Sequence, residues 1–274
     1  MNLSLNDQAI LNNGIKIPYL GLGAYLLNGK EAVNAIHWAL EAGYRHIDTA
    51  RMYNNEKEVG AAVKSSGIPR EEIFITTKLW NDEHGFDRAR KACFKSLERL
   101  GLDFIDLYLI HWPGGGEREE TWRALESLYD EGVCKSIGVS NYTINHLKGT
   151  LAKANIIPQI NQVEFSPFLY QRELLEFCID NKIQLEAYSP LGKGEILNNS
   201  RLKEIAIKYS KSTAQILIRW CLQHNIVVIP KSANKGRIIE NASVYDFEIS
   251  SEDMKILDSF HRNLRVTWNP EGVR

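Results

Sequence analysis

Four side chains that could move a proton follow short apolar stretches of this sequence. Asp48 ends "HID", Lys78 ends "FITTK" and His111 ends "LYLIH". Tyr53 follows Asp48 in the polar loop "TARMYNNE". A carboxylate, an ammonium, an imidazole and a phenol are groups that act as general acids and bases in enzymes. Each alone could be structural, as a helix cap, a solvated strand end, a core histidine or a surface aromatic. Together they favour a shared site, which distant parts of the chain must assemble.

Short apolar runs and helical patterns alternate along the whole chain. These are the elements that would bring the four side chains together. The runs are "YLGLG", "RHIDT", "IFITTK", "FIDLYLIH", "KSIGVSN", "QINQVEF", "IQLEAYSP" and "IVVIPKS". Helical spacing of apolar residues follows within 32–40, 56–65, 86–100, 119–131, 144–152, 172–181, 202–209, 214–221 and 235–241. Runs without polar alternation are typical of buried parallel strands. About eight strand–helix units without a linker predict one (β/α)₈ barrel domain over residues 1–274, with a doubly wound sheet as the alternative.

A barrel would bring further polar residues to the same mouth, because functional side chains lie at the carboxyl ends of barrel strands. These residues end or lie within the later runs and are Ser140, Asn141, Gln162, Tyr188, Ser189, Lys231 and Ser232. Ahead of the barrel, Asn13-Gly14 within "AILNNGIKIPYL" predicts a β-hairpin.

The composition of the chain argues against several classes of protein, among them nucleic-acid-binding, membrane-bound and metal-dependent proteins. The 33 basic and 34 acidic residues give a net charge of −1, which argues against a nucleic acid or an anionic membrane as partner. No apolar run approaches ~18 residues, and "MNLSLNDQAI" lacks the pattern of a signal peptide. The four cysteines form no CxxC pair and are expected to be buried free thiols in the cytoplasm. The remaining histidines do not fall at metal-ligand spacings, so no metal site is expected and a barrel hydrolase or metal enzyme is disfavoured.

The motifs together resemble those of the aldo-keto reductases over nearly the whole chain, from Gly21 to Asn241. They are "GLGAY", "HIDTARMYNNE", "TKLW", "DLYLIHWP", "SIGVSNY", "INQVEFSPF", "AYSPLGKG" and "IPKSANKGRIIEN". The resemblance implies a (β/α)₈ barrel whose N-terminal hairpin closes the bottom. It also implies an NADP-dependent oxidoreductase that reduces small carbonyl compounds with NADPH. The short loop after His111 and the short C-terminal tail are similar to the microbial aldehyde/diketogluconate reductase type.

The same resemblance assigns a catalytic tetrad to Asp48, Tyr53, Lys78 and His111. Tyr53 would donate a proton to the carbonyl oxygen as hydride reaches the carbon, and His111 would orient that oxygen. A free tyrosine titrates near ~10, and a neighbouring ammonium favours the phenolate. We therefore expect Lys78, held by Asp48, to lower the pKa of Tyr53.

A nicotinamide cofactor would be held without a Rossmann glycine motif. "GLGAYL" has Leu26 at the third glycine position, and no phosphate-binding lysine follows the glycines at 114–116. The resemblance implies Ser140, Asn141 and Gln162 at the carboxamide, Tyr188 against the ring, and Ser189, Leu191 and Gly192 over the pyrophosphate. Lys231, Ser232 and Arg237 form a basic and hydroxyl cluster suited to a phosphate monoester, and the resemblance implies that this group is the 2′-phosphate of NADPH. Glu240 and Asn241 would meet the adenine.

The carbonyl pocket would be lined by His111 and four aromatic residues, Tyr25, Trp80, Trp112 and Trp268. Such a lining suits small aldehydes and ketones with some apolar surface. Two departures from the family pattern are Asn54-Asn55, where Gly-Asn is frequent, and Ala24-Tyr25. The protein is expected to be a monomer. The alternative function is a non-catalytic, NADP(H)-binding regulatory protein on the same barrel, which the fold alone would not distinguish.

Overall fold

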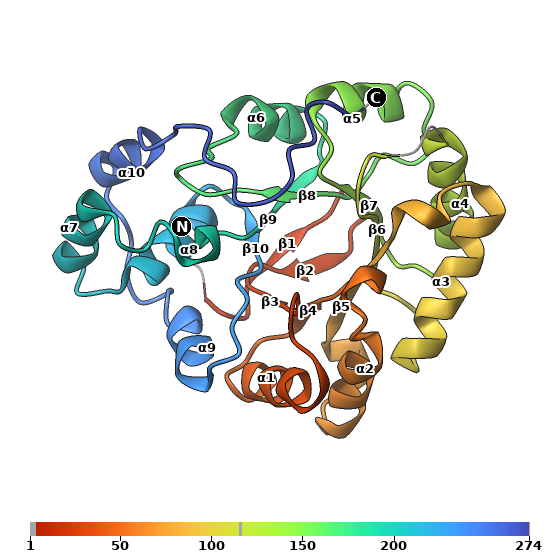
Figure 1. The fold of residues 1–274 in the computed structure, drawn as a ribbon, viewed down its shortest axis with the longest axis horizontal. Coiled ribbons are helices and arrows are strands. Elements are labelled where there is room, and N and C mark those ends of the chain that lie inside the picture. Colours follow the sequence, from red (N-terminus) through yellow and green to blue (C-terminus); the bar gives the residue numbers. More distant parts are fainter. Residues whose placement is uncertain (1–3, 115–116, 274) are drawn as a thin grey trace.

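A parallel sheet of eight strands curls around the centre of the computed structural model, which describes residues 4–114 and 117–273 (Figure 1). Gly115 and Gly116 of the triple-glycine stretch lie outside these residues. The strands are β3 (Leu22–Gly23), β4 (His46–Asp48), β5 (Phe74–Leu79), β6 (Leu107–Ile110), β7 (Ile137–Ser140), β8 (Ile160–Glu164), β9 (Gln184–Tyr188) and β10 (Val227–Val228). Each strand pairs in parallel with the next. A parallel bridge between Leu20 and Val228 joins the last strand to the chain just before the first, which closes the cylinder.

Helices connect successive strands and lie outside the sheet (Figure 1). They are α1 (Gly29–Glu41), α2 (Glu56–Ser65), α3 (Phe86–Leu100), α4 (Arg118–Asp130), α5 (Ile144–Leu151), α6 (Arg172–Asp180), α7 (Ser200–Lys208), α8 (Thr213–Gln223), α9 (Lys235–Ala242) and α10 (Ser251–Asp258). Short 3-10 turns are η1 (Arg51–Tyr53), η2 (Arg70–Glu72), η3 (Asn81–Glu83) and η4 (Gly192–Gly194). The main apolar core lies between strands and helices, as expected for buried parallel strands.

An antiparallel hairpin of β1 (Gln8–Ile10) and β2 (Lys16–Pro18) closes one end of the barrel. Its buried side chains, Ala9 and Ile17 among them, share a core cluster with the first residues of several strands, such as Phe74 and Leu107. The amino ends of the strands are therefore covered, and the carboxyl ends form the open mouth. The predicted (β/α)₈ barrel with a hairpin at its bottom is confirmed.

Two neighbouring helices of the outer ring approach closely at a glycine. A Cβ atom on Gly60 of α2 would lie 1.8 Å from the carbonyl oxygen of Leu100 at the end of α3. The obstacle is backbone, which a rotamer change does not remove. By contrast, a Cβ on Gly149 of α5 would meet nothing within 4 Å.

The barrel interior contains a layer of buried polar side chains below the mouth. His46 of β4 and Glu186 of β9 are both fully buried, with Nε2 of His46 3.7 Å from Oε1 of Glu186 and 3.1 Å from the Thr76 hydroxyl. Burial lowers the pKa of His46 to about 3. Burial, followed by the nearby Asp48 carboxylate, raises the pKa of Glu186 to about 8. Both groups are therefore mainly uncharged near neutral pH.

Two expectations from composition can be compared with the described residues. All four cysteines are buried and free, as expected. Among helices in the described part of the chain, none is long and apolar enough to cross a membrane.

Replacing Gly60 by alanine should lower the free energy of unfolding by about 1–3 kcal/mol, because α2 and α3 must move apart. Gly149→Ala is the matched control. It also adds one methyl group to a helix, and should leave stability unchanged or raise it by up to about 1 kcal/mol. Urea unfolding of both variants makes the comparison, and equal effects would contradict the close approach.

The contribution of Glu186 to stability should fall with rising pH between about 4.5 and 8, because folded Glu186 keeps a proton that the unfolded chain has released. The slope is at most about 1.4 kcal/mol per pH unit. Glu186→Gln removes this contribution and keeps the side-chain shape. Urea unfolding at about pH 6 and at about pH 8 should show the variant gaining on wild type at the higher pH. A pH-independent difference would mean that Glu186 is already ionised in the folded state.

Candidate active site

A buried ion pair lies at the carboxyl ends of β4 and β5. Nζ of Lys78 lies 2.6 Å from Oδ1 of Asp48 and donates a second hydrogen bond to the carbonyl oxygen of Thr49 at 2.8 Å. The side chains of Lys78 and Asp48 are 0% and 3% exposed. Parallel pairing of β4 with β5 brings the two residues to neighbouring strand ends. A cation buried this deeply is stable only with such partners.

Tyr53 follows β4 on the one-turn helix η1 and extends toward this pair. Its hydroxyl lies 3.5 Å from Nζ of Lys78, and Nζ is 4.9 Å from the centre of its ring. Asn54 ends η1 with a left-handed backbone, φ 55°, which asparagine tolerates better than most residues. That conformation explains why asparagine can stand where the family frequently has glycine. Asn55 is fully buried and donates to the carbonyl oxygens of Ala24 and Leu27, which fixes the loop.

The expected direction of the Tyr53 pKa is wrong. Burial of the phenol, followed by the charge of Asp48, raises its pKa well above its usual range. The positive charge of Lys78 is matched by Asp48 at 2.6 Å, so no uncompensated cation faces the hydroxyl. Tyr53 therefore keeps its proton near neutral pH and is available as a donor.

His111 follows β6 directly and lies beside Tyr53, with ring centroids 5.5 Å apart. Burial, followed by the charge of Lys78, lowers the pKa of His111 well below its usual range. The imidazole is therefore neutral. Its Nδ1 is buried and has no hydrogen-bond partner among the described residues. A neutral ring can donate from one nitrogen only.

Gln162 of β8 lies beneath this group, where it is bonded to two carboxyl groups. Its Nε2 donates to Oδ2 of Asp48 at 2.8 Å and to Oε2 of Glu186 at 3.0 Å. Glu186 was not predicted as a site residue, although a carboxyl group inside the apolar run "IQLEAY" was a visible signal. His46, beside Glu186, was missed in the same way.

Ser140, Asn141 and Tyr188 come together at the ends of β7 and β9. The Tyr188 hydroxyl lies 2.8 Å from Oδ1 of Asn141. Nδ2 of Asn141 donates to the carbonyl oxygen of His111 and to the Ser140 hydroxyl, each at 3.0 Å. Three of the residues expected at the cofactor are therefore one hydrogen-bonded group next to His111.

The remaining residues expected at the cofactor lie on two segments of the mouth. Ser189, Leu191 and Gly192 follow β9 and lead into η4, with left-handed φ angles of 48° at Ser189 and 53° at Gly192. Lys231 and Ser232 follow β10, before the start of α9. The Ser232 hydroxyl is held locally by the backbone of Asn234, the residue that caps α9.

In the basic cluster at the start of α9, Ser232 is hydrogen-bonded, whereas the two cationic side chains extend into solvent. Lys231 and Arg237 are exposed, and among the described residues neither side chain forms an ion pair. Arg237 donates its backbone N–H to the Asn234 side chain at 3.0 Å. Glu240 is half-buried and Asn241 is buried on the same helix. In this part of the described chain, two exposed cations thus lie close in sequence to the N-terminus of α9.

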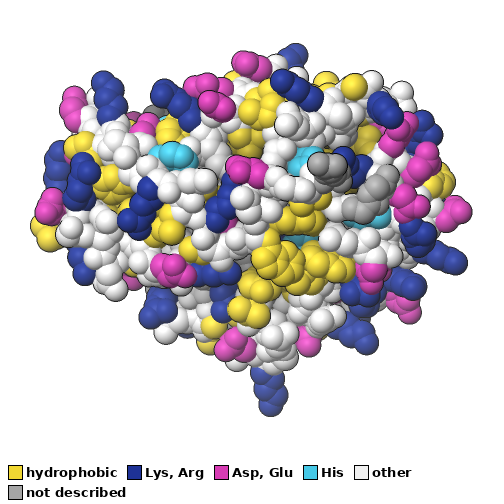
Figure 2. All heavy atoms as spheres, turned by 45° about the horizontal axis from the view of Figure 1, so that its top comes forward, with side chains coloured by type: hydrophobic (Ala, Val, Ile, Leu, Met, Phe, Trp, Pro, Cys, Tyr) yellow, Lys and Arg dark blue, Asp and Glu magenta, His cyan; other side chains and the backbone are white. Residues whose placement is uncertain are grey.

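Aromatic rings surround the Tyr53–His111 pair. Tyr25 packs against Tyr53 at 5.0 Å between centroids, and Trp80 packs against His111 at 5.1 Å. Trp268 of the C-terminal segment lies 6.2 Å from Trp80 and 5.9 Å from Trp112. Tyr25 and Trp268 are partly exposed, at 42% and 61%. Figure 2 shows hydrophobic side chains gathered near the middle of one face, with charged side chains around them. The aromatic residues predicted for the pocket thus form one wall.

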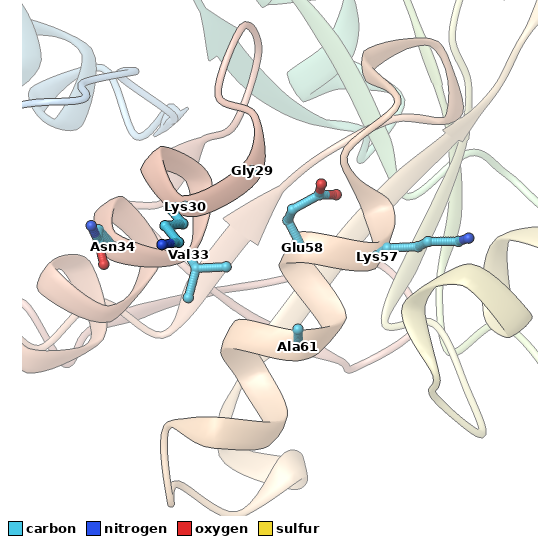
Figure 3. Close-up of a pocket in the computed structure, with 7 residues that line it drawn as sticks. All are labelled: Gly29, Lys30, Val33, Asn34, Lys57, Glu58 and Ala61. Carbon is cyan, nitrogen blue, oxygen red and sulfur yellow. The ribbon is translucent and has the colours of Figure 1, made fainter.

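A separate surface groove of about 390 Å³ lies between α1 and α2 (Figure 3). Its lining residues are Gly29, Lys30, Val33, Asn34, Lys57, Glu58 and Ala61. None of the residues predicted for the site takes part in it. In the described residues, no group of three or more His, Cys, Asp or Glu side chains is placed to hold a metal ion.

Comparisons with known proteins agree with the motifs and the barrel. The model of the Aldo/keto reductase family matches residues 19–262. A glyoxal reductase of Bacillus subtilis (strain 168) is 50% identical over 274 residues, covering 100% of this chain and 99% of that protein. The crystal structure of MGS-M4, an aldo-keto reductase from a deep-sea metagenome library, has a TM-score of 0.95 and 46% identity, covering 97% of this chain and 99% of that one. A Bombyx mori aldo-keto reductase in complex with NADP has a TM-score of 0.91 and 37% identity, covering 97% and 96%. The chain therefore belongs to the aldo-keto reductase family.

Proposed function

We propose that this protein reduces small aldehydes and ketones to alcohols, with NADPH as the reductant and Tyr53 as the proton donor. The observation that supports it most is the grouping of Tyr53 and His111 over the buried Lys78–Asp48 pair at the open end of the barrel. In the overall reaction a carbonyl compound, NADPH and a proton give an alcohol and NADP⁺. The bound cofactor supplies the hydride.

The residues present fit a nicotinamide dinucleotide. The hydroxyl of Ser140 and the side-chain amide of Asn141 offer donors and acceptors for a carboxamide beside the Tyr188 ring. Lys231 and Arg237, exposed beside the start of α9, offer charge-assisted hydrogen bonds to a phosphate monoester. This second group favours NADPH over NADH, because NADH lacks the 2′-phosphate. In this arrangement Gln162 donates a hydrogen bond to Asp48 and also lies next to the carboxamide.

The proton step depends on where Tyr53 is held rather than on unusual acidity. The reduced oxygen would be an alkoxide, a far stronger base than a phenolate, so a phenol with a raised pKa still donates to it. Nζ of Lys78 has three hydrogens. Two reach Asp48 and Thr49, and the third lies on the side of Tyr53, where it stabilises the phenolate that remains. Neutral His111 donates a hydrogen bond to the carbonyl oxygen and so fixes its direction.

The substrate class follows from the aromatic wall and from one relative. Tyr25, Trp80, Trp112 and Trp268 suit flat or apolar carbonyl compounds. Because a relative with 50% identity is a glyoxal reductase, small α-dicarbonyls such as glyoxal are included in the proposal.

Tyr53→Phe should lower kcat/KM for glyoxal and for an aromatic aldehyde by about 10²–10⁴, the usual contribution of a positioned proton donor. The affinity for NADPH should change less than about threefold, because the Tyr53 hydroxyl is not one of the proposed cofactor contacts. NADPH oxidation and a fluorescence titration measure the two quantities. Full activity in the variant would remove Tyr53 as the acid. Tight NADPH binding by wild type without turnover of any aldehyde, dicarbonyl or keto-sugar would favour the regulatory alternative.

Arg237→Ala should weaken NADPH binding by roughly 10- to 100-fold, since it deletes charged hydrogen bonds to the 2′-phosphate. NADH binding should stay within about threefold of wild type, because the contact is absent there. Lys235→Ala is the matched control, a nearby exposed cation on α9 that pairs with Glu41 at 3.4 Å. Titration of each variant with both cofactors gives the result, and an unchanged preference for NADPH in Arg237→Ala would contradict the assignment.

A further inference from the structure

The C-terminal segment after α10 crosses the mouth of the barrel. In Figure 1 it runs from α10 past the end of β8 and finishes beside α5. Nε2 of His146 on α5 lies 2.7 Å from the carbonyl oxygen of Val273, which holds the far end. The segment has no regular secondary structure between residues 261 and 273, so its position over the mouth depends on contacts with the barrel.

The backbone N–H groups of Arg262 and Leu264 are bonded to the Phe168 carbonyl oxygen, and the next residues are held by one carboxyl group, Glu164 at the end of β8. Its Oε1 accepts a hydrogen bond from the Val266 backbone N–H at 2.7 Å. Its Oε2 accepts from the Thr267 backbone N–H at 3.0 Å, and also from the Thr267 hydroxyl. Glu164 is 3% exposed. A buried carboxylate with three donors is a strong attachment, because bonds to an ionised acceptor exceed neutral ones.

Thr267 connects this attachment to Tyr188. Its hydroxyl oxygen lies 2.9 Å from the Tyr188 hydroxyl. Because the Thr267 hydroxyl donates its hydrogen to Glu164, the Thr267 oxygen presents lone pairs to Tyr188. Tyr188 in turn reaches Asn141, whose amide donates to the carbonyl oxygen of His111. The Tyr188 hydroxyl has a single hydrogen, which it can donate to Thr267 or to Asn141 but not to both at once, so Glu164 is joined to the strand end of His111 by a continuous series of polar contacts.

The next residue, Trp268, belongs to the aromatic wall of the carbonyl pocket. It contacts Trp80 and Trp112 while 61% of its own surface stays exposed. Packing of its ring alone therefore holds it weakly, and its place depends on the backbone at Val266 and Thr267. Two consecutive residues, Thr267 and Trp268, face the two proposed binding regions, with Glu164 directly behind them.

We propose that Glu164 is a positioning residue that fixes the C-terminal segment and thereby couples the wall of the carbonyl pocket to the Tyr188 platform. The roles of the carbonyl pocket and of the cofactor site at Tyr188 rest on the proposed function. The attachment of the C-terminal segment by Glu164 does not depend on that function. Losing Glu164 would free Trp268 and Tyr188 together, and would leave the Lys78–Asp48 pair and Tyr53 in place.

Glu164→Gln tests the attachment, because the amide keeps the size but turns one acceptor into a donor that faces Thr267. Glu126→Gln is the matched control. Glu126 is also buried, at 5%, and accepts two backbone N–H bonds, from Asn155 and Ile156 at 2.7 and 2.8 Å, in a loop before β8. Trypsin cleavage after Arg262 and Arg265, followed by intact mass, reports release of the segment without requiring activity.

We expect Glu164→Gln to be cleaved roughly 10-fold faster or more, since local opening becomes easier, and Glu126→Gln to be cleaved at the wild-type rate. KM for an aromatic aldehyde should rise about 10-fold in Glu164→Gln, with a smaller rise for glyoxal and a change in kcat below about threefold. Equal cleavage of the two variants would overturn the attachment. Faster cleavage with unchanged KM values would overturn the coupling.

Thr267→Val tests the contact with Tyr188, because it keeps both backbone donors to Glu164 and deletes the hydroxyl, which contacts Tyr188 and donates the third bond to Glu164. Cleavage should stay within about threefold of wild type, while NADPH binding weakens by roughly 5- to 10-fold. Unchanged NADPH binding would overturn the link through Thr267. If no carbonyl compound were reduced by wild type, the proposed function would fail, and the cleavage rates would still decide whether Glu164 holds the segment.

Discussion

The ion pair between Lys78 and Asp48 is the interaction on which the rest of the site depends. It places a full positive charge inside the barrel, where an unmatched charge costs several kcal/mol. Asp48 supplies the counter-charge at 2.6 Å, the Thr49 carbonyl supplies a second acceptor, and Gln162 holds the other carboxylate oxygen. Only one direction of the ammonium is left, and Tyr53 lies there at 3.5 Å. The pair thus determines both where the phenol is and which charge it faces.

The polar layer beneath the ion pair, formed by Gln162 and Glu186, adds no second negative charge near Asp48. Glu186 and Asp48 share the amide of Gln162, so two anions there would repel one another in a medium of low polarity. Glu186 avoids this by holding a proton near neutral pH. Asp48 then remains the single anion next to the single cation. Because the charges of Lys78 and Asp48 largely cancel at the Tyr53 hydroxyl, the pair does not lower the pKa of Tyr53. The proposed proton transfer therefore depends on the position of Tyr53.

The sequence predicted the barrel and the grouping of the site well, for a physical reason. Buried parallel strands are unbroken apolar runs, so a polar residue at the end of a run, such as Lys78 or His111, stands out. Glu164 and Glu186 lie inside apolar runs, so the sequence predicts them as parts of strands and does not mark them as site residues. The direction of the Tyr53 pKa depends on which of several charges is matched, and spacing along the chain contains no such information. The contact between Glu164 and Thr267 joins residues about a hundred positions apart and needed coordinates. The roles given to individual residues, the monomeric state and the cytoplasmic location stay predictions.

The cylinder is sealed at a narrow seam. β10 has only two residues, and the backbone bonds from Gly21 to Val228 and from Val228 to Tyr19 join it to the start of the chain. The next bond across, from Gly23 to Pro230, ends directly before Lys231. A phosphate bound by Lys231 would therefore contact the same stretch of chain, from Val228 to Lys231, whose backbone bonds close the barrel. Ligand binding and closure of the cylinder would then be linked, and loading with the dinucleotide would slow amide hydrogen exchange most along this edge.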